Sequence, residues 1–170
     1  MNHQKPTIMN DKLTSNHEMK GSNYGRFFGM LGLSFIAMYI TMYLNTYEID
    51  HVYFSLTRFY MTCLGISAMA VIMLSMMLKM YKNRKKNIAI YAGSLVLFLG
   101  ALGFVRAQSP VVGDVLYMKA MIPHHSIAIL TSKRADIDDP EVRKLADDII
   151  KAQVEEISEM KKMIERLENK

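Results

Sequence analysis

One short run of the chain combines side chains that together could bind a soft metal ion. It reads Met121-Ile-Pro-His124-His125, and Met118 and Asp114 precede it at helical spacing. In a helix, spacings of four, three and four residues place all of these except His124 on one face. Imidazole nitrogen and thioether sulfur suit soft or borderline metals, copper above all. The alternative interpretation is structural, because methionine at helical spacing also fills apolar cores.

A second amphipathic helix is expected after a turn at residues 138–140. Apolar and weakly polar side chains recur there at three- and four-residue spacings, at Ala146, Ile149, Ile150, Gln153, Ile157, Met160 and Ile164. The stripe is bordered by Gln153, Glu156, Met160 and Met163. Two amphipathic helices joined by a short polar loop form a hairpin, since their apolar faces must meet. Such a hairpin could bring the methionines of the second helix near the histidines of the first.

The two halves of this hairpin resemble the family called domain of unknown function 305. The shared pattern begins with Asp114, an aromatic at Tyr117, Met121 and Pro-His-His, and continues with Gln-x-x-Glu-Ile-x-x-Met from Gln153 to Met160. It covers residues 110–169. The resemblance implies a ferritin-like helical bundle, and it implies copper as the metal, because some members are periplasmic copper-binding proteins.

Two positions depart from the family pattern. Thr131 stands where many members have a methionine, and Met163 stands where many have an aromatic residue. The first change removes one candidate ligand and the second adds one. Because many members of the family have no demonstrated activity, the resemblance implies the fold more firmly than it implies the function.

We therefore expect a copper-like metal site formed by both helices of the hairpin. The candidate ligands are His124, His125, Met121, Met118 and Met160. The candidate outer partners, which would fix a histidine tautomer, are Asp114, Gln153 and Glu156. No nucleophile motif and no phosphate-binding glycine loop occurs in the chain, so we expect a binding protein and not an enzyme.

Three long apolar runs predict transmembrane helices, at residues 27–44, 59–78 and 88–105. None of them contains an acidic or basic residue, and each is near the roughly 20 residues that cross a bilayer core of ~30 Å. Buried helices of a soluble core fit runs of this length poorly. The apolar runs thus predict an all-α protein with three transmembrane helices before the hairpin, and the family resemblance implies that this hairpin is half of a four-helix bundle of ferritin-like type.

The distribution of basic residues predicts the orientation of these helices. Lysine and arginine gather in the tail 1–26 and in the loop 79–86, whereas the first loop carries Glu48, Asp50 and only Arg58. Positively charged loops stay on the cytoplasmic side. We expect a multi-pass protein of a cell (inner or plasma) membrane with a cytoplasmic amino terminus and an extracytoplasmic carboxyl-terminal domain. The net charge of +5 reflects this topology and gives no reason to expect a nucleic-acid partner.

The domain organisation follows from these patterns. We expect a disordered cytoplasmic tail at 1–26, a three-span membrane domain at 27–106 and an extracytoplasmic hairpin at 107–170. A hairpin of this length buries little surface and is rarely stable alone. A homodimer could complete a four-helix bundle, or the membrane helices could cover the open side. The expected partners are thus membrane lipid, a metal ion and a second copy of the chain.

Two local features leave alternatives open. Glu48-x-x-His51 occurs once, whereas di-iron bundles need that motif twice with further carboxylates, so a ferritin-like oxidoreductase is disfavoured. Asp50 and His51 could still support a metal passed from the hairpin, although a solvated loop is the simpler interpretation. Pro123 must either kink its helix or begin a new one.

The function that these observations favour is membrane-anchored, extracytoplasmic binding of copper-like soft metal ions, for tolerance or delivery. The alternative is a structural or partner-binding membrane module in which the histidines serve packing and hydrogen bonding.

Overall fold

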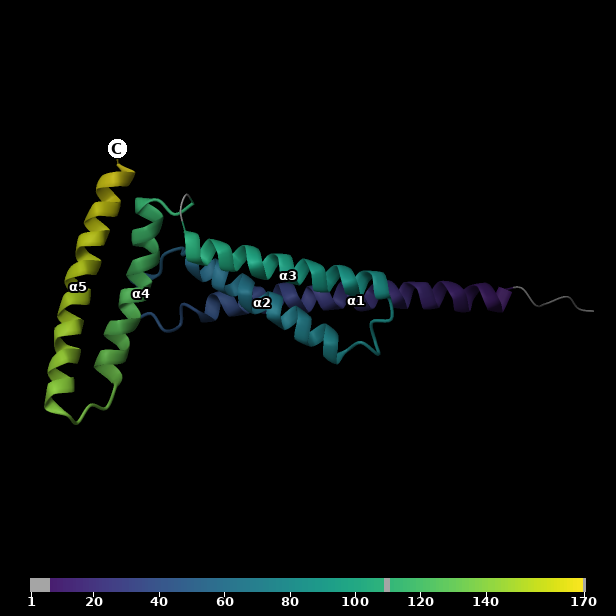
Figure 1. Ribbon diagram of the computed structural model, residues 1–170, viewed down its shortest axis with the longest axis horizontal. Coiled ribbons are helices and arrows are strands. Elements are labelled where there is room, and N and C mark those ends of the chain that lie inside the picture. The colour runs from purple at the N-terminus through teal and green to yellow at the C-terminus, as the bar shows by residue number, and fades with distance from the viewer. Residues whose placement is uncertain (1–6, 109–110, 170) are drawn as a thin grey trace, which may run out of the picture.

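The computed structural model describes residues 7–108 and 111–169, and all regular structure in that part of the chain is helical. The elements are α1 (Thr7–Thr41), the 3-10 turn η1 (Ile49–His51), α2 (Leu56–Met76), α3 (Arg84–Ala107), α4 (Asp114–Arg134) and α5 (Pro140–Glu168). Helices α1, α2 and α3 form an elongated bundle, and the hairpin α4–α5 lies across one end of it (Figure 1). The all-α prediction is confirmed for the described residues.

Helix α2 is the centre of the bundle, because α1 and α3 both pack closely on it, whereas α1 and α3 meet through side chains near Tyr24. Buried hydrogen bonds hold one end of the bundle together. At the end away from the hairpin, buried Tyr24 donates a hydrogen bond to Asn87 Oδ1 at 2.7 Å, and Asn87 Nδ2 donates to the Tyr81 carbonyl at 2.6 Å. These bonds join α1, the α2–α3 loop and the first turn of α3.

Helix α1 begins at Thr7 and therefore runs through most of the tail that the sequence predicts to be disordered. Residues 1–6 of that tail lie outside the described residues. From residue 7 to residue 20 the chain contains neither proline nor glycine. Because adding residues to an existing helix is much easier than nucleating one, the apolar helix that follows can extend backwards into this polar stretch.

Two described helices, α2 and α3, are long and apolar enough to cross a membrane by length and composition. Helix α1 is not among them. It joins the polar residues 7–26 to the first apolar run, and the rest of that run lies in turns beyond the end of the helix at Thr41. The third span therefore remains a prediction from the sequence.

The hairpin is fixed at its turn by several capping interactions. The Asp139 side chain accepts hydrogen bonds from the amides of Glu141 and Val142 at 2.9 and 3.0 Å, and Pro140 takes the first helical position of α5. This combination favours a helix start at that point in the chain. Arg143 donates from both terminal nitrogens to the Ser132 carbonyl at 3.1 Å, which satisfies an open end of α4.

Between α4 and α5 lies one apolar core. Its buried members are Met118, Ile122, Ile129, Ile157, Met160 and Ile164. Tyr47 and Tyr53 of the first loop also pack against this core, so the loop covers part of the open side of the hairpin. Pro123 is buried, and α4 continues through it without a break. The structure thus excludes a new helix start at Pro123.

Gly65 lets α1 approach α2 closely, which generates a testable prediction. A Cβ atom at Gly65 would lie 2.8 Å from Met38 Sδ. Gly65→Ala should be tolerated, because the tip of the methionine side chain can shift. Gly65→Ile should lower the free energy of unfolding by roughly 1–3 kcal/mol, because the larger side chain overpacks the contact between α1 and α2. Thermal unfolding in mild detergent measures the loss. Gly100→Ile is the matched control, because no atom lies within 4 Å of a Cβ there. Equal losses from the two isoleucine variants would contradict this account.

Candidate functional site

Three consecutive residues of α4 point into three different environments. The side chain of His124 is exposed, the side chain of His125 is only 14% exposed and faces α5, and Ser126 is fully buried against the first loop. Successive residues of an α-helix are rotated by about 100°. The His-His pair is therefore divided between solvent and the helix interface.

His125 faces Glu156 across the hairpin in an incomplete interaction. Its Nδ1 lies 3.0 Å from Glu156 Oε2, yet the two groups are not aligned for a hydrogen bond, and Nδ1 is buried without a hydrogen-bond partner among the described residues. Two atoms that bind one metal at tetrahedral angles lie roughly 3.3 Å apart when each bond is about 2.05 Å long. The His125–Glu156 separation lies within the ordinary hydrogen-bond range, so only the misalignment prevents a bond, and it is also close to the spacing of two ligands on one ion.

The protonation state of His125 also suits metal binding. Burial lowers the pKa of its imidazole, the nearby His124 lowers it further, and Glu156 opposes the shift. The ring is therefore neutral around neutral pH, which is the form that can bind a metal through a ring nitrogen. Glu156 itself is exposed, and its Oε2 accepts a hydrogen bond from Gln153 Nε2 at 3.4 Å. Gln153 thus lies beside the carboxylate, as the sequence analysis expected of an outer partner.

The predicted methionine ligands lie one helical turn from this pair. Met121 precedes His125 by four residues and Met160 follows Glu156 by four, and because the helices are antiparallel both residues fall on the same side of the pair. Met160 is buried in the hairpin core, and Met121 is partly buried against it. Met118 is buried in the same core. The structure therefore gives the three thioethers a packing role, and it leaves two of them next to the His125–Glu156 pair.

Two predicted site residues lie apart from His125. Asp114 is exposed in the first turn of α4, about 16 Å along the helix axis from His125. A carboxylate there stabilises the positive end of the helix dipole, which accounts for this position without a metal. The His124 ring centroid is 6.1 Å from that of His125, so the two rings do not converge on one point in this conformation.

A hydrogen-bond network beside the histidines includes residues that the sequence analysis did not assign to a site. The buried Ser126 hydroxyl accepts a bond from the Tyr47 amide at 2.8 Å and lies 3.0 Å from His51 Nδ1. Since the serine oxygen already accepts from Tyr47, its proton is free to bond His51 Nδ1. We therefore assign the proton of His51 to Nε2, which lies 3.7 Å from both Glu48 and Asp50.

The cluster of Glu48, Asp50 and His51 brings three potential ligand atoms within 4.8 Å of one another. However, Lys161 of α5 forms an ion pair with Asp50 at 2.5 Å. That ion pair lowers the pKa of the Asp50 carboxyl, mainly through the hydrogen bond from Lys161. A cation at the cluster would have to compete with this ammonium group. The cluster therefore acts in the structure as the contact between the first loop and α5.

Two further contacts hold the hairpin on the bundle. Lys133 of α4 donates to the Tyr47 hydroxyl at 2.8 Å and lies 4.3 Å from the centre of that ring. Arg58, in the first turn of α2, donates to the Met42 carbonyl at 2.6 Å and to the Pro123 carbonyl at 3.3 Å. The sequence analysis favoured a solvated loop for Glu48, Asp50 and His51, whereas His51 is buried against Ser126. Nothing in the sequence indicated this docking.

The protein is thus a helical protein in which apolar helices precede a helical hairpin that carries the His124–His125 pair. Residues 106–170 match the family described as Domain of unknown function (DUF305), which confirms the resemblance noted above. The chain is similar to an uncharacterized protein of Acanthamoeba polyphaga mimivirus, with 33% identity over 146 residues that cover 83% of this chain and 93% of the relative. The chain therefore belongs to the same family as this viral protein, and its residues 106–170 form the DUF305 domain. No solved structure matches it at a significant level.

The contact between His51 and Ser126 should make docking of the first loop depend on pH. Burial, together with the Lys161 charge, lowers the pKa of His51 despite Asp50 and Glu48. The undocked loop therefore takes up a proton first as pH falls below about 6.5, and docking weakens in that window. The rate of hydrogen exchange in residues 46–52, corrected for intrinsic rates, should rise as the pH is lowered from 7 to 5.

The matched variant for this experiment is His51→Asn. Asparagine offers an oxygen that can accept the Ser126 proton, and it does not titrate in this range. Its exchange should be nearly the same at both pH values. Because the pKa of Asp50 is lowered below its ordinary 3.8, the Asp50–Lys161 pair persists throughout. An equal pH dependence in the variant and the parent would rule out His51 as the cause.

Proposed function

We propose that this protein is a membrane-anchored module that binds a copper-like soft metal ion on the extracytoplasmic side. One observation carries the proposal. The buried Nδ1 of His125 lies 3.0 Å from Glu156 Oε2 without an aligned hydrogen bond, one helical turn from Met121 and Met160. A buried polar atom without a partner is costly in a native structure. An ion between the two groups would remove that cost.

The residues at this position can supply a mixed set of ligands. His125 would give nitrogen, Glu156 would give oxygen or orient the imidazole, and Met121 or Met160 would give sulfur. His124 is exposed one residue away and would join by a change of rotamer. Thioether and imidazole ligands favour copper over calcium or magnesium. The ion is then cargo held for tolerance or delivery, and the proposed role involves no catalysis.

The apolar surface of the bundle supports a position in the membrane. Only 11% of the residues in the apolar stretch of α3 are buried, unlike those of the core helix of a soluble protein. Its side chain at Val96 is 72% exposed, and the side chain of Leu33 on α1 is 70% exposed. Helices of 21 and 24 residues are about 32 and 36 Å long, enough for a bilayer core of ~30 Å. We propose that α1 crosses beside them as the third span.

The two ends of the bundle support the proposed orientation. The α2–α3 loop and the start of α3 carry lysines and arginines, and the hairpin lies at the opposite end with Glu48 and Asp50 (Figure 1). Tyrosines occur at both ends, Tyr24 and Tyr81 at the basic end and Tyr43 near Arg58 at the other. Basic residues on the cytoplasmic side and aromatic residues at both interfaces are typical of membrane proteins.

The alternative function is a structural or partner-binding module without metal. The observation that favours it is the burial of Met118 and Met160 in the hairpin core, where each is less than 10% exposed. A homodimer belongs to this alternative as well as to the metal-binding proposal, because α5 exposes Val142, Leu145 and Val154. Measurement of metal affinity separates the two functions.

Substitutions at the His125–Glu156 pair should weaken copper binding by the purified protein in mild detergent. We expect His125→Ala to remove most of the bound copper in elemental analysis. Glu156→Gln should weaken affinity roughly 10- to 100-fold, as outer partners of ligands do. Met121→Leu keeps the volume and should weaken monovalent copper more than divalent copper, because sulfur is the softer donor.

The matched controls are Glu159→Gln, an exposed carboxylate on the same helix, and Met73→Leu in α2. Both should retain the affinity of the parent, and circular dichroism should show unchanged helix content in every variant. If the double variant of His124 and His125 to alanine bound copper as tightly as the parent, the structural module would be the better account.

The proposed orientation can be tested by labelling in intact cells. Cys63 is first replaced by serine to remove the single native thiol. A cysteine introduced at Asn169 should then react with an impermeant thiol reagent, and a cysteine at Lys85 should react only after the membrane is opened. The reverse labelling pattern would overturn the orientation and, with it, the extracytoplasmic site.

A further inference from the structure

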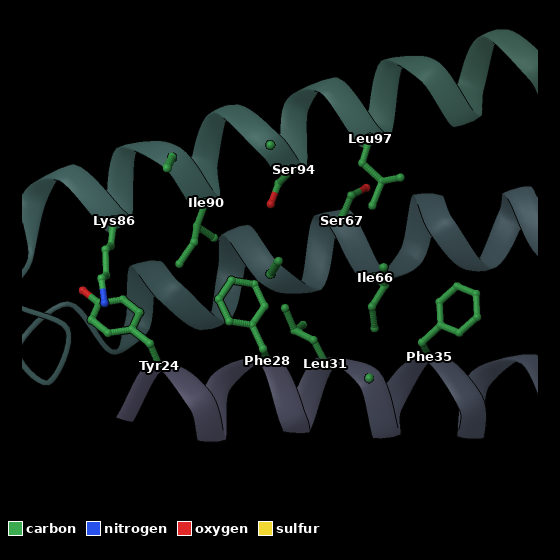
Figure 2. A pocket seen from close by; sticks show the side chains of 14 residues that line it. Tyr24, Phe28, Leu31, Phe35, Ile66, Ser67, Lys86, Ile90, Ser94 and Leu97 are labelled. Atoms are coloured by element: carbon green, nitrogen blue, oxygen red, sulfur yellow. The ribbon is translucent and has the colours of Figure 1, made fainter. Parts of the chain in front are cut away.

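A long apolar groove separates α1 from α3 on one side of the bundle (Figure 2). It exists because both helices pack closely on α2, while their backbones stay apart from each other. Its volume is about 650 Å³. The apolar walls include Phe28, Leu31 and Phe35 of α1, and Ile90 and Leu97 of α3. A volume of this size is within the range of pockets that bind small molecules.

The base of the groove is formed by small side chains. Ser67 and Ala70 of α2 are buried there, and Gly93 and Ser94 of α3 complete the lining. The Ser67 hydroxyl donates to the Leu64 carbonyl at 2.8 Å, so its polarity is satisfied within α2. The groove therefore presents a nearly apolar surface to an occupant along most of its length.

One end of the groove is positively charged. Lys86 and Tyr24 line that end, and Lys86 Nζ lies 5.0 Å from the centre of the Tyr24 ring (Figure 2). From residue 51 to residue 113 the sequence contains no aspartate or glutamate, whereas Lys82, Arg84 and Lys85 accompany Lys86. An occupant with an apolar body and a negatively charged end would match this distribution of charge.

The length of the groove also limits what could fill it. From Lys86 to Leu97 the helix rises about 16 Å, and from Tyr24 to Phe35 it rises by the same amount. One leaflet contributes about 15 Å to a bilayer core of ~30 Å. An acyl chain that starts at the basic interface would therefore run along the groove to about the middle of the membrane.

We propose that the groove binds one acyl chain of an anionic phospholipid, whose phosphate pairs with Lys86. This inference rests on the proposed position of α1–α3 in a membrane, and it does not depend on the metal site. The lipid belongs to the leaflet at the basic end of the bundle. A zwitterionic lipid would fill the same apolar walls but would gain less from Lys86, since its headgroup carries no net charge.

Native mass spectrometry of the full chain from mild detergent tests the proposal, with phosphatidylglycerol and phosphatidylcholine as probes of equal chain length. The parent should retain one phosphatidylglycerol in preference to phosphatidylcholine. Lys86→Gln should reduce that preference about fivefold, because it removes the charge that lines the groove and contacts the phosphate, a contact worth about as much as one basic residue held against an anionic headgroup. Ser94→Leu should fill the groove and reduce retention of both lipids.

Two control variants change neighbouring positions outside the lining. Lys85→Gln removes an equal charge next to Lys86, and Gly100→Leu adds an equal side chain further along α3. Both should keep the selectivity of the parent. Equal retention of the two lipids by the parent, or equal effects of Lys85→Gln and Lys86→Gln, would overturn the proposal. So would a second copy of the chain filling the groove, seen as a dimer that Ser94→Leu dissociates.

Failure of this inference can be told apart from failure of the proposed function. If thiol labelling places the bundle across the membrane but the two lipids bind equally, only the lipid site is wrong. If labelling shows no membrane crossing, the membrane placement fails first and the lipid site fails with it. Copper affinity should be unchanged in Lys86→Gln, because Lys86 lies at the end of the bundle opposite the hairpin.

Discussion

The buried hydroxyl of Ser126 is the point on which the arrangement of the two halves of the chain depends. A buried hydroxyl is costly unless its hydrogen-bonding capacity is used. Here the Tyr47 amide and His51 use it, and both come from the loop that connects α1 with α2. This contact fixes the rotation of α4 about its own axis. Once Ser126 faces the loop, His125 must face α5 and His124 must face solvent, because neighbouring helical residues differ by about 100°.

That fixed rotation explains why the site is half buried. His125 is held neutral by burial beside a carboxylate that it does not bond well, while His124 remains open to solvent. Apolar packing in the hairpin core fixes the side chains of Met121 and Met160. Their positions therefore do not depend on a bound ion. The same methionines thus stabilise the hairpin, and Met121 and Met160 lie about one helical turn from the His125–Glu156 pair. Packing and metal binding make compatible demands on these positions, which is why the sequence pattern alone leaves both interpretations open.

The sequence predicted the helical hairpin well, because its apolar period, the Asp-Pro turn and the family pattern all agree. It also named Glu156 as a candidate outer partner of the histidines, and the structure brings Glu156 opposite His125. It did not predict the docking of the first loop, since hydrogen bonds between Ser126 and a residue 75 positions away leave no periodic trace. Asp114 shares a helical face with His125, but rise along the axis separates them. Helix α1 extends further than expected, because propagation from an apolar helix can override a polar composition.

Helix α5 packs on α4 and on no other described helix, and it meets the first loop through Lys161. It is therefore a unit that could separate from α4 while the bundle stays intact, as local cooperative units of proteins do. An ion bound between α4 and α5 would bind only the closed hairpin. At a free concentration 100 times its dissociation constant, such an ion would stabilise the closed form by about 2.7 kcal/mol. The fraction of hairpins in the closed form would then rise with the concentration of the ion.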